Sequence, residues 1–446
     1  MTLAIENVSL TNQNHSDLLE KIKQKTAHIG IIGMGYVGLP NMVSKARQGY
    51  TVTGFDIDQQ KVDNVNKAHS YIEDVATDDL FELVLKHKKI SATTNFEQLD
   101  RMDVIMICVP TPIDRHKQPI LSYIKDATRE IVHHAKTPAL IILESTTYPG
   151  TTEDIIVTEF EKNNYQIGRD FFVAYSPERI DPSNQLFNVD NTQRVVGGHT
   201  PECTVLAAEF INQYAHTVSS TRTAEMSKVF ENTFRYVNIA LSNELAKICE
   251  KSGIDVWEVL EASKTKPFGF MPFYPSTGVG GHCIPVDPHY LNWFGKKFDH
   301  TSKLIDAATD INDSMLDYTL TKISQILNEQ KKALYNSRIA IVGAAYKKNI
   351  GDVRESPIFK VYRSLRAFGA AVDVYDPYVD HFISNGERIE VSDVKYEALA
   401  DCDMTLILTD HDRVEYPSVL KYSPCVFDTK NACKHLNTSD VSYHKL

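Results

Sequence analysis

The residue best suited to covalent chemistry is Cys283, in the segment FYPSTGVGGHCIPVDPHY at 273–290. The glycines before it, including Gly280, leave a loop of little side-chain bulk, so a small molecule could approach the sulfur closely. A thiol becomes a nucleophile when a nearby cation or helix N-terminus lowers its pKa. Cys108 and Cys249 lie within apolar strand-like and helix-like segments and are expected to be core residues. A loop cysteine alone is more often structural than catalytic, so its interpretation depends on its companions.

The companion signature is a glycine-rich turn near the start of the chain. An apolar run at 27–33 leads into a turn and then a helix-compatible stretch, and the turn residues are Gly33, Met34, Gly35, Tyr36, Val37 and Gly38. The next strand-like run, at 50–55, ends at Asp56. Strand, glycine turn, helix and acid in this order predict a dinucleotide site: Gly33 permits the tight turn, Gly35 admits a pyrophosphate and Gly38 allows close packing. Asp56 can accept both adenosine ribose hydroxyls and would repel a 2′-phosphate, so NAD is favoured over NADP. The alternative is a turn that only connects strand and helix.

These chemical groups need elements to position them. Strand-like runs at 103–109 and 139–143 end in loops that contain Thr111 and Thr146. Ligands of doubly wound sheets bind beyond the carboxyl ends of the strands, so both loops should line the cofactor. Apolar residues at helical spacing predict a helix over 219–252 that is unusually long, and a second helical stretch is expected at 302–332.

The opening pattern then repeats. A strand at 338–343, a turn, a helix at 357–368 and a strand at 371–375 are expected, and the turn carries Lys347 and Lys348 in place of the later glycines. This suits a nucleotide diphosphate better than a second NAD; a purely structural domain with solvated lysines is the alternative. The predicted fold class is therefore α/β, with two Rossmann-like doubly wound domains joined by a central helical domain. The expected boundaries are 1–26 for a polar extension, 27–217 for the NAD domain, 218–335 for the helical domain and 336–446 for the nucleotide-sugar domain.

Composition excludes several other classes. The chain has 446 residues and a formal net charge of −11, which argues against a general nucleic-acid or anionic-membrane surface. Seven cysteines without CxxC spacing argue against a disulfide framework or a zinc ribbon, and no metal site is expected. Neither a signal peptide nor a membrane span is recognisable, so the chain is expected to be cytoplasmic.

Seven ordered motifs resemble the UDP-glucose/GDP-mannose dehydrogenase family over about 27–435. The motifs are GMGYVGLP at 33–40, CVPTP at 108–112, ESTTYPGTTE at 144–153, YSPERIDP at 175–182, KVFENTFRYVNIALSNELAKIC at 228–249, GVGGHCIPVDP at 278–288 and YKKNIGDVRESP at 346–357. Within the family, KPFGFMPFYP at 266–275 and HCIPVDP look most like UDP-N-acetylglucosamine 6-dehydrogenases. The resemblance implies NAD as cofactor, a UDP-sugar as substrate, a homodimer or higher homo-oligomer built on the central helices, and a product used for surface polysaccharide.

The resemblance also implies roles for individual residues. Cys283 matches the nucleophile, Lys228, Asn232 and Asp287 its polar partners, and Thr146 and Glu178 residues that hold or activate water. Asp56, Thr111 and Arg354 match cofactor contacts. The positions that match contacts to the nucleotide sugar are Glu178, Arg179, Lys228, Asn232, Tyr274, Gly280, Lys347 and, more distantly, Lys430. His282 is expected to serve packing or hydrogen bonding.

A thiol beside NAD is the combination that oxidises an aldehyde through a thioester. The expected reaction is a four-electron oxidation of a UDP-sugar at C6, with UDP-N-acetylglucosamine as the leading substrate. UDP-glucose, UDP-N-acetylgalactosamine and UDP-N-acetylmannosamine are the alternatives. A two-electron 3-hydroxyacid dehydrogenase and a non-enzymatic sensor of NAD or nucleotide sugars are competing interpretations, and Cys283 counts against both.

Overall fold

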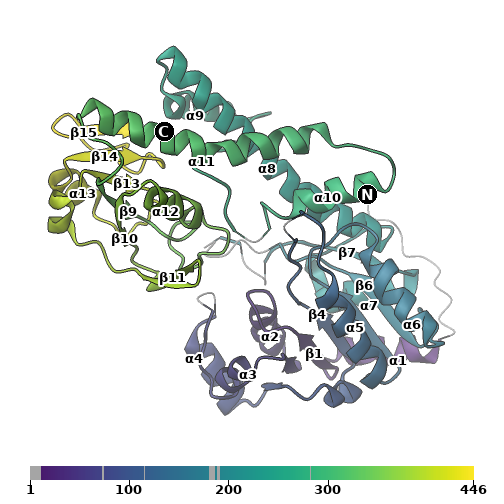
Figure 1. Cartoon of the computed structure of the whole chain (residues 1–446). Coiled ribbons are helices and arrows are strands. Elements are labelled where there is room, and N and C mark those ends of the chain that lie inside the picture. Colours follow the sequence, from purple (N-terminus) through teal and green to yellow (C-terminus); the bar gives the residue numbers. More distant parts are fainter. Residues whose placement is uncertain (1–11, 73–74, 115, 180–185, 188–190, 282) are drawn as a thin grey trace. The chain divides into compact units, whose positions relative to one another are not determined.

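The computed structural model describes residues 12–72, 75–114, 116–179, 186–187, 191–281 and 283–446. The chain forms two compact units, the first from Met1–Glu231 with His289–Phe298 and the second from Asn232–Pro288 with Asp299–Leu446. Two helices, α8 (Thr221–Ser252) and α10 (Asp287–Lys296), continue without a break where the chain passes from one unit to the other. Figure 1 follows the chain through both units. The division into three domains with the boundaries expected above remains a prediction.

The first unit is built on an eight-stranded sheet with the order β3-β2-β1-β4-β5-β6-β7-β8. Its strands are β1 His28–Ile32, β2 Thr51–Phe55, β3 Ile90–Thr93, β4 Val104–Ile107, β5 Ala139–Leu143, β6 Phe171–Tyr175, β7 Arg194–Gly198 and β8 Ala215–Thr217. All neighbours are parallel except β6 and β7. The helices between them are α1 Gln13–Lys23, α2 Gly38–Arg47, α3 Gln59–Asn66, α4 Thr77–Leu80, α5 Ser122–His134, α6 Thr158–Lys162 and α7 Pro201–Ile211. The order of the first six strands is that of a dinucleotide-binding doubly wound sheet, as predicted.

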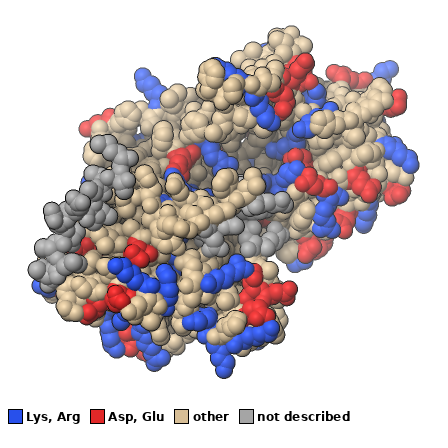
Figure 2. Space-filling view, turned by 180° about the vertical axis from the view of Figure 1, so that it is seen from behind, with Lys and Arg blue, Asp and Glu red and all other residues tan. Residues whose placement is uncertain are grey.

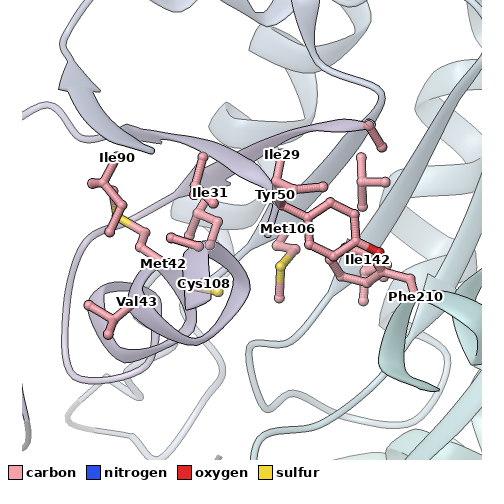
Figure 3. Packing of buried hydrophobic residues seen from close by; sticks show 14 of the residues in the cluster. Ile29, Ile31, Met42, Val43, Tyr50, Ile90, Met106, Cys108, Ile142 and Phe210 are labelled. Carbon is pink, nitrogen blue, oxygen red and sulfur yellow. The ribbon is translucent and has the colours of Figure 1, made fainter. Parts of the chain in front are cut away.

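Both faces of this sheet are buried, which explains the continuous apolar runs of its strands. Ile29 and Ile31 of β1 belong to one hydrophobic cluster, whereas Ile32 belongs to the cluster on the opposite face. Figure 3 shows the first cluster, where side chains of the central strands lie beside Met42 of α2 and Phe210 of α7. The buried sheet thereby fixes the loops at its carboxyl edge.

The second unit repeats this plan on a smaller sheet with the order β10-β9-β13-β14-β15 and parallel neighbours throughout. The strands are β9 Arg338–Val342, β10 Ala371–Tyr375, β13 Met404–Ile407, β14 Cys425–Asp428 and β15 Ser442–Lys445, with a separate hairpin of β11 His381–Ser384 and β12 Glu387–Glu390. Helices α12 (Ile358–Ala367) and α13 (Tyr416–Tyr422) belong to this half. The predicted repeat is confirmed, and strand ends differ from prediction by a residue or two where turns begin.

Long helices complete the second unit. The part of α8 after Glu231 packs along α11 (Lys303–Glu329): the Asn243 amide donates to Asn312 Oδ1 at 2.9 Å, and Lys247 Nζ donates to Ser314 Oγ at 2.6 Å. Helix α8 ends at Ser252, and the φ of +71° at Gly253 suits the left-handed position after a helix. Helix α9 (Val256–Lys264) follows. Helix α8 was predicted from apolar periodicity, and α11 lies within the second helical stretch predicted at 302–332.

The surface of α8 carries an apolar stripe. Phe234, Leu241 and Ile248 are 43%, 62% and 58% exposed and lie seven residues apart, so they share one side of the helix. On the face of the molecule shown in Figure 2, basic and acidic side chains are interspersed. None of the helices among the described residues is both long and apolar enough to cross a membrane.

Candidate active site

The glycine turn between β1 and α2 has the geometry that a dinucleotide needs. Gly33 has φ +92°, and a Cβ there would lie 2.7 Å from the Cys108 carbonyl oxygen. A Cβ on Gly38 would lie 1.8 Å from the Gly33 carbonyl oxygen, so only glycine lets α2 start this close to the strand. A Cβ on Gly35 would meet no atom within 4 Å, which leaves open space in front of the turn. These residues therefore fit a bound pyrophosphate.

Asp56 ends β2 beside this turn. Its Oδ2 accepts the Met34 N–H at 2.9 Å and lies 3.3 Å from Lys61 Nζ, and its Oδ1 accepts the Asp58 N–H at 3.0 Å. The Tyr71 hydroxyl donates to the Met34 carbonyl at 2.7 Å and braces the turn from the other side. The acid predicted to contact the ribose is thus held in place before any ligand binds. Tyr36 is exposed, and Val37 is the residue that precedes α2.

The predicted cofactor loops follow β4 and β5. Thr111 is buried, and its carbonyl accepts the Tyr290 hydroxyl of α10 at 2.6 Å. Thr146 is half-buried in the loop after β5. That loop is tied to α8 by Glu225, whose carboxylate accepts the Gly150 N–H at 2.5 Å and the Thr152 N–H at 2.8 Å. Burial raises the pKa of Glu225 to about 7, although these hydrogen bonds lower it.

Glu178 and Arg179 follow β6. Glu178 is 8% exposed and accepts the Arg179 N–H at 2.6 Å. The Arg179 guanidinium pairs with Glu231 of α8 and donates to the Gln193 carbonyl at 3.1 Å. A residue predicted to contact the sugar nucleotide is therefore already engaged by a carboxylate.

A cluster that sequence reasoning missed lies behind Glu178. Asn41, Glu144 and Arg194 are all buried, and the Arg194 guanidinium pairs with the Glu144 carboxylate. Burial raises the pKa of Glu144, against the lowering effect of Arg194. The sequence signal was a charged residue directly at the end or start of an apolar strand, which is unusual for a strand buried on both faces.

The predicted nucleophile belongs to the second unit. Cys283 is half-buried, and its carbonyl accepts the N–H of Asp287, the first residue of α10, at 2.9 Å. Cys283 therefore lies in the turn that leads into α10. Asp287 Oδ2 accepts the Asn232 amide at 2.5 Å, which brings two of the predicted partners together. Lys228 is buried on α8 one turn before Asn232, so both lie on the same side of that helix.

The glycine loop before Cys283 is fixed on the segment 346–357. A Cβ on Gly280 would lie 2.6 Å from Tyr346 Cβ, and Gly281, with φ +87°, donates its N–H to the Arg354 carbonyl at 3.1 Å. The same segment carries Lys347. The second unit thus places the nucleophile loop against residues predicted to bind substrate and cofactor. The Arg354 guanidinium donates to Asp352, with Nε–Oδ2 at 2.9 Å.

Other predicted residues are held by different elements. The Tyr274 hydroxyl donates to Glu261 of α9 at 2.8 Å, and its ring stacks on Trp257. Lys430 follows β14 and is half-buried; burial lowers its pKa, opposed by Asp410 and Asp428. His282 lies outside the described residues.

The second glycine turn is filled by its own carboxylate. Asp376, at the end of β10, accepts the N–H groups of Ala344 and Ala345 at 2.7 and 3.0 Å, and His411 Nε2 lies 2.9 Å from the same oxygen. His411 Nδ1 accepts the Asn349 N–H, so Nε2 carries the proton and donates to Asp376. Lys348 Nζ pairs with Asp412 at 2.7 Å rather than projecting alone. The contact to Ala344 repeats that of Met34 with Asp56 in the first turn, whereas the contact to Ala345 is an addition that takes up this amide as well.

Comparison with known proteins agrees with this arrangement. Three parts of the UDP-glucose/GDP-mannose dehydrogenase family match the chain: the NAD binding domain at 27–216, the central domain at 222–314 and the UDP binding domain at 340–435. A UDP-N-acetyl-D-glucosamine 6-dehydrogenase of Pseudomonas aeruginosa is 37% identical over 80% of this chain and 84% of its own length. A UDP-N-acetyl-D-mannosamine dehydrogenase of Methanococcus maripaludis (strain C7) is 33% identical over 91% and 93%. The solved structure of a UDP-D-ManNAc dehydrogenase from Pyrococcus horikoshii matches with a TM-score of 0.84 at 31% identity, covering 94% of this chain and 98% of that one.

Proposed function

The chain belongs to the UDP-glucose/GDP-mannose dehydrogenase family and is an NAD-dependent UDP-sugar dehydrogenase, and we propose that it oxidises the C6 alcohol of UDP-N-acetylglucosamine to a carboxylate. One observation supports the covalent route most directly. Cys283 lies in the turn before α10, after a loop packed on the segment that carries Lys347 and Arg354, and its carbonyl contacts Asp287 of the hydrogen-bonded pair Asn232 and Asp287. A simple alcohol dehydrogenase needs no thiol in such a place.

The first half of the reaction makes and traps an aldehyde. Lys228, or a water molecule held by Asp287, takes the proton of the 6-hydroxyl. The glycine turn and Asp56 would hold NAD+, which would supply the hydride acceptor for C6 in each of the two oxidations. The Cys283 thiolate then adds to the aldehyde carbon, and Lys228 and Asn232 donate hydrogen bonds to the oxygen that becomes negative. The hydrogen bond from Asn232 to Asp287 fixes the orientation of that amide.

The second half releases the acid. After the second oxidation the sugar is a thioester on Cys283. Water held by Thr146 adds to the thioester carbonyl, its proton passes to the Glu178 carboxylate, and the carbon–sulfur bond breaks. The sulfur leaves as the thiolate and the acid ionises to the uronate. Glu178 and the base of the first half then release to solvent the protons that they took up, so each residue returns to its starting state.

The nearest alternative substrate is UDP-N-acetylmannosamine. Relatives named for it match a larger share of this chain than the relative named for UDP-N-acetylglucosamine, at similar identity. UDP-glucose and UDP-N-acetylgalactosamine follow. The deciding assay incubates each UDP-sugar separately with excess NAD+ and measures NADH per mole of sugar. Two NADH from UDP-N-acetylglucosamine, and slower reaction of the other sugars, would support the proposal; one NADH would indicate a two-electron enzyme.

The covalent step is tested by Cys283→Ser, with Cys249→Ser as the control because Cys249 is a buried core residue of α8. Removal of a covalent nucleophile should lower turnover by at least ~10²-fold, whereas the control should remain active. Mass spectrometry of wild-type enzyme quenched during turnover should show a sugar adduct on the peptide that contains Cys283. Near-wild-type NADH production by Cys283→Ser would contradict the thioester route, and binding of NAD and UDP-sugar without any NADH would favour a sensor.

We also propose that two copies of the chain pair through α8. The stripe of Phe234, Leu241 and Ile248 is exposed and repeats every seven residues, as in helices that pair along a seam. An apolar stripe of this kind is stabilised when a second helix removes it from water.

A further inference from the structure

Four polar side chains converge inside the first unit beside the glycine turn, where the Asn41 amide donates to the Val37 carbonyl at 2.9 Å. Asn41 comes from α2, Glu144 from the end of β5, Glu178 from the end of β6 and Arg194 from the start of β7. They are 0%, 2%, 8% and 4% exposed. Four separate elements thus deliver polar groups to one buried point.

The contacts lead from Glu144 to Glu178. Arg194 Nη2 donates to Glu144 Oε1 and to the Ser176 carbonyl, while Nη1 donates to Asn41 Oδ1 at 3.3 Å and lies 3.8 Å from Glu178 Oε2. The Asn41 amide nitrogen lies 3.0 Å from Glu144 Oε2 and 3.4 Å from Glu178 Oε2. Asn41 and Arg194 therefore contact both carboxylates at once.

One guanidinium is shared by two carboxylates in this cluster. Cys108 and Lys45 also face the cluster: the Cys108 thiol donates to Glu144 Oε2 at 3.4 Å and its pKa is raised by burial, and Lys45 lines the small pocket beside Asn41 and Arg194. The Arg179 N–H donates to Glu178 Oε1, and the Arg179 guanidinium pairs with Glu231. A change of charge at Asn41, Glu144 or Arg194 would therefore alter the surroundings of the Glu178 carboxylate.

We propose that Asn41, Glu144 and Arg194 are positioning residues that orient the Glu178 carboxylate toward the attacking water, and that their charges set the pH dependence of thioester hydrolysis. This inference rests on the proposed function, because it concerns hydrolysis of the thioester. In that step the water oxygen bonds to the thioester carbon, its proton moves to Glu178 and the sulfur leaves. Glu144 and Arg194 alone would form a neutral pair; the contacts from Arg194 and Asn41 to Glu178 extend the cluster to a residue with a proposed catalytic role.

Two near-isosteric substitutions change the charge beside Glu178 in opposite directions. Glu144→Gln removes a negative charge near Glu178, so hydrolysis should persist to lower pH. Asn41→Asp adds a negative charge and removes the amide donor, so the lowest pH at which hydrolysis proceeds (its acid limit) should rise. The expected displacement is about 1 pH unit or more, the typical effect of a nearby charge. Asn41→Leu adds no charge but removes both the donor to the carboxylates and the acceptor for Arg194. It should shift the limit in the same direction as Asn41→Asp and serves if that variant does not fold.

The readout is the decay of the Cys283 adduct after rapid mixing with one equivalent of UDP-sugar and excess NAD+, followed by mass spectrometry from pH 5 to 9. Asp103→Asn is the matched control: it likewise turns a carboxylate of this unit into an amide, at the residue before β4, where Asp103 accepts the His28 N–H and pairs with Lys21. Its acid limit should coincide with that of wild type. If Asn41 and Glu144 had only a structural role, their substitution would lower stability without moving the acid limit of hydrolysis in opposite directions.

Opposite displacements in Glu144→Gln and Asn41→Asp, with the control in place, would support the inference. Equal acid limits in all folded variants, or displacements of the same sign, would overturn it while leaving the proposed function intact. A wild-type enzyme that produces NADH without any adduct, or no NADH at all, would instead refute the proposed function and this inference together.

Discussion

Gly280→Ala should damage the enzyme through packing. A Cβ at this position would lie 2.6 Å from Tyr346 Cβ and 3.1 Å from the Glu355 carbonyl oxygen. Neither atom is the end of a flexible side chain, and carbon atoms prefer separations of about 3.5 Å, so the loop or the segment 346–357 must move by about 1 Å. Overpacking of this kind typically costs 1–3 kcal/mol, and ~1 Å of misplacement near reacting groups can cost ~10²-fold in rate.

Gly278→Ala is the matched control in the same loop. Its Cβ would lie 3.5 Å from Pro357 Cγ, an ordinary van der Waals contact. Replacing glycine where the backbone tolerates alanine is neutral or slightly stabilising, because the unfolded chain loses freedom. The two variants therefore differ in packing while sharing the same chemical change.

The assay compares thermal unfolding of the ligand-free proteins and then kcat with a saturating UDP-sugar. Gly280→Ala should unfold several degrees below Gly278→Ala, because 1 kcal/mol corresponds to about 2–4 °C for a unit of this size. Its kcat should fall by about 10²-fold, since Cys283 follows three residues later. Equal unfolding temperatures and equal kcat values would show that Gly280 is not required for this close approach.

Further predictions concern cofactor choice, pH and assembly. Asp56→Ala should weaken NAD binding by about tenfold, the value of one charge-assisted hydrogen bond, and raise relative activity with NADP; an unchanged NAD/NADP ratio of kcat/KM would contradict the assigned role. Burial raises the pKa of Glu225 from 4.5 to about 7, so the folded protein keeps this proton to higher pH than the unfolded chain does. The resulting stabilisation of about 3 kcal/mol is fully present below pH 4.5 and is lost as the pH rises through 7. The free energy of unfolding of Glu225→Gln should accordingly vary less between pH 5 and 8 than that of wild type. Parallel plots of this free energy against pH for the two proteins would refute the assignment. Leu241→Glu should convert dimers to monomers in light scattering after gel filtration, whereas an unchanged mass would exclude α8 as the seam.

Local pattern was enough to predict much of the fold. The glycine turn, Asp56 and the buried strands are each recognisable within a few residues, because turn sterics and burial on both faces restrict the sequence there. The long helix α8 was predicted for the same reason, from a 3.6-residue repeat of apolar positions.

The partners of the site residues were less predictable. Asn232 and Asp287 are 55 positions apart, and their hydrogen bond exists only because two helices converge. Arg179 was expected to contact the sugar nucleotide, but nothing local indicates its ion pair with Glu231. The cluster of Glu144 and Arg194 is likewise assembled from distant strands. Polar contacts of this kind depend on tertiary packing, which periodicity does not encode.

The turn of the second unit differs from the first in that Asp376 takes the Ala345 amide in addition to the Ala344 amide. In the proposed route a single coenzyme site, at Gly33–Gly38, would serve both oxidations in succession. The half-oxidised sugar would then have to stay bound to sulfur while NADH leaves and fresh NAD+ enters, so the lifetime of that bond would limit how slowly the exchange can proceed.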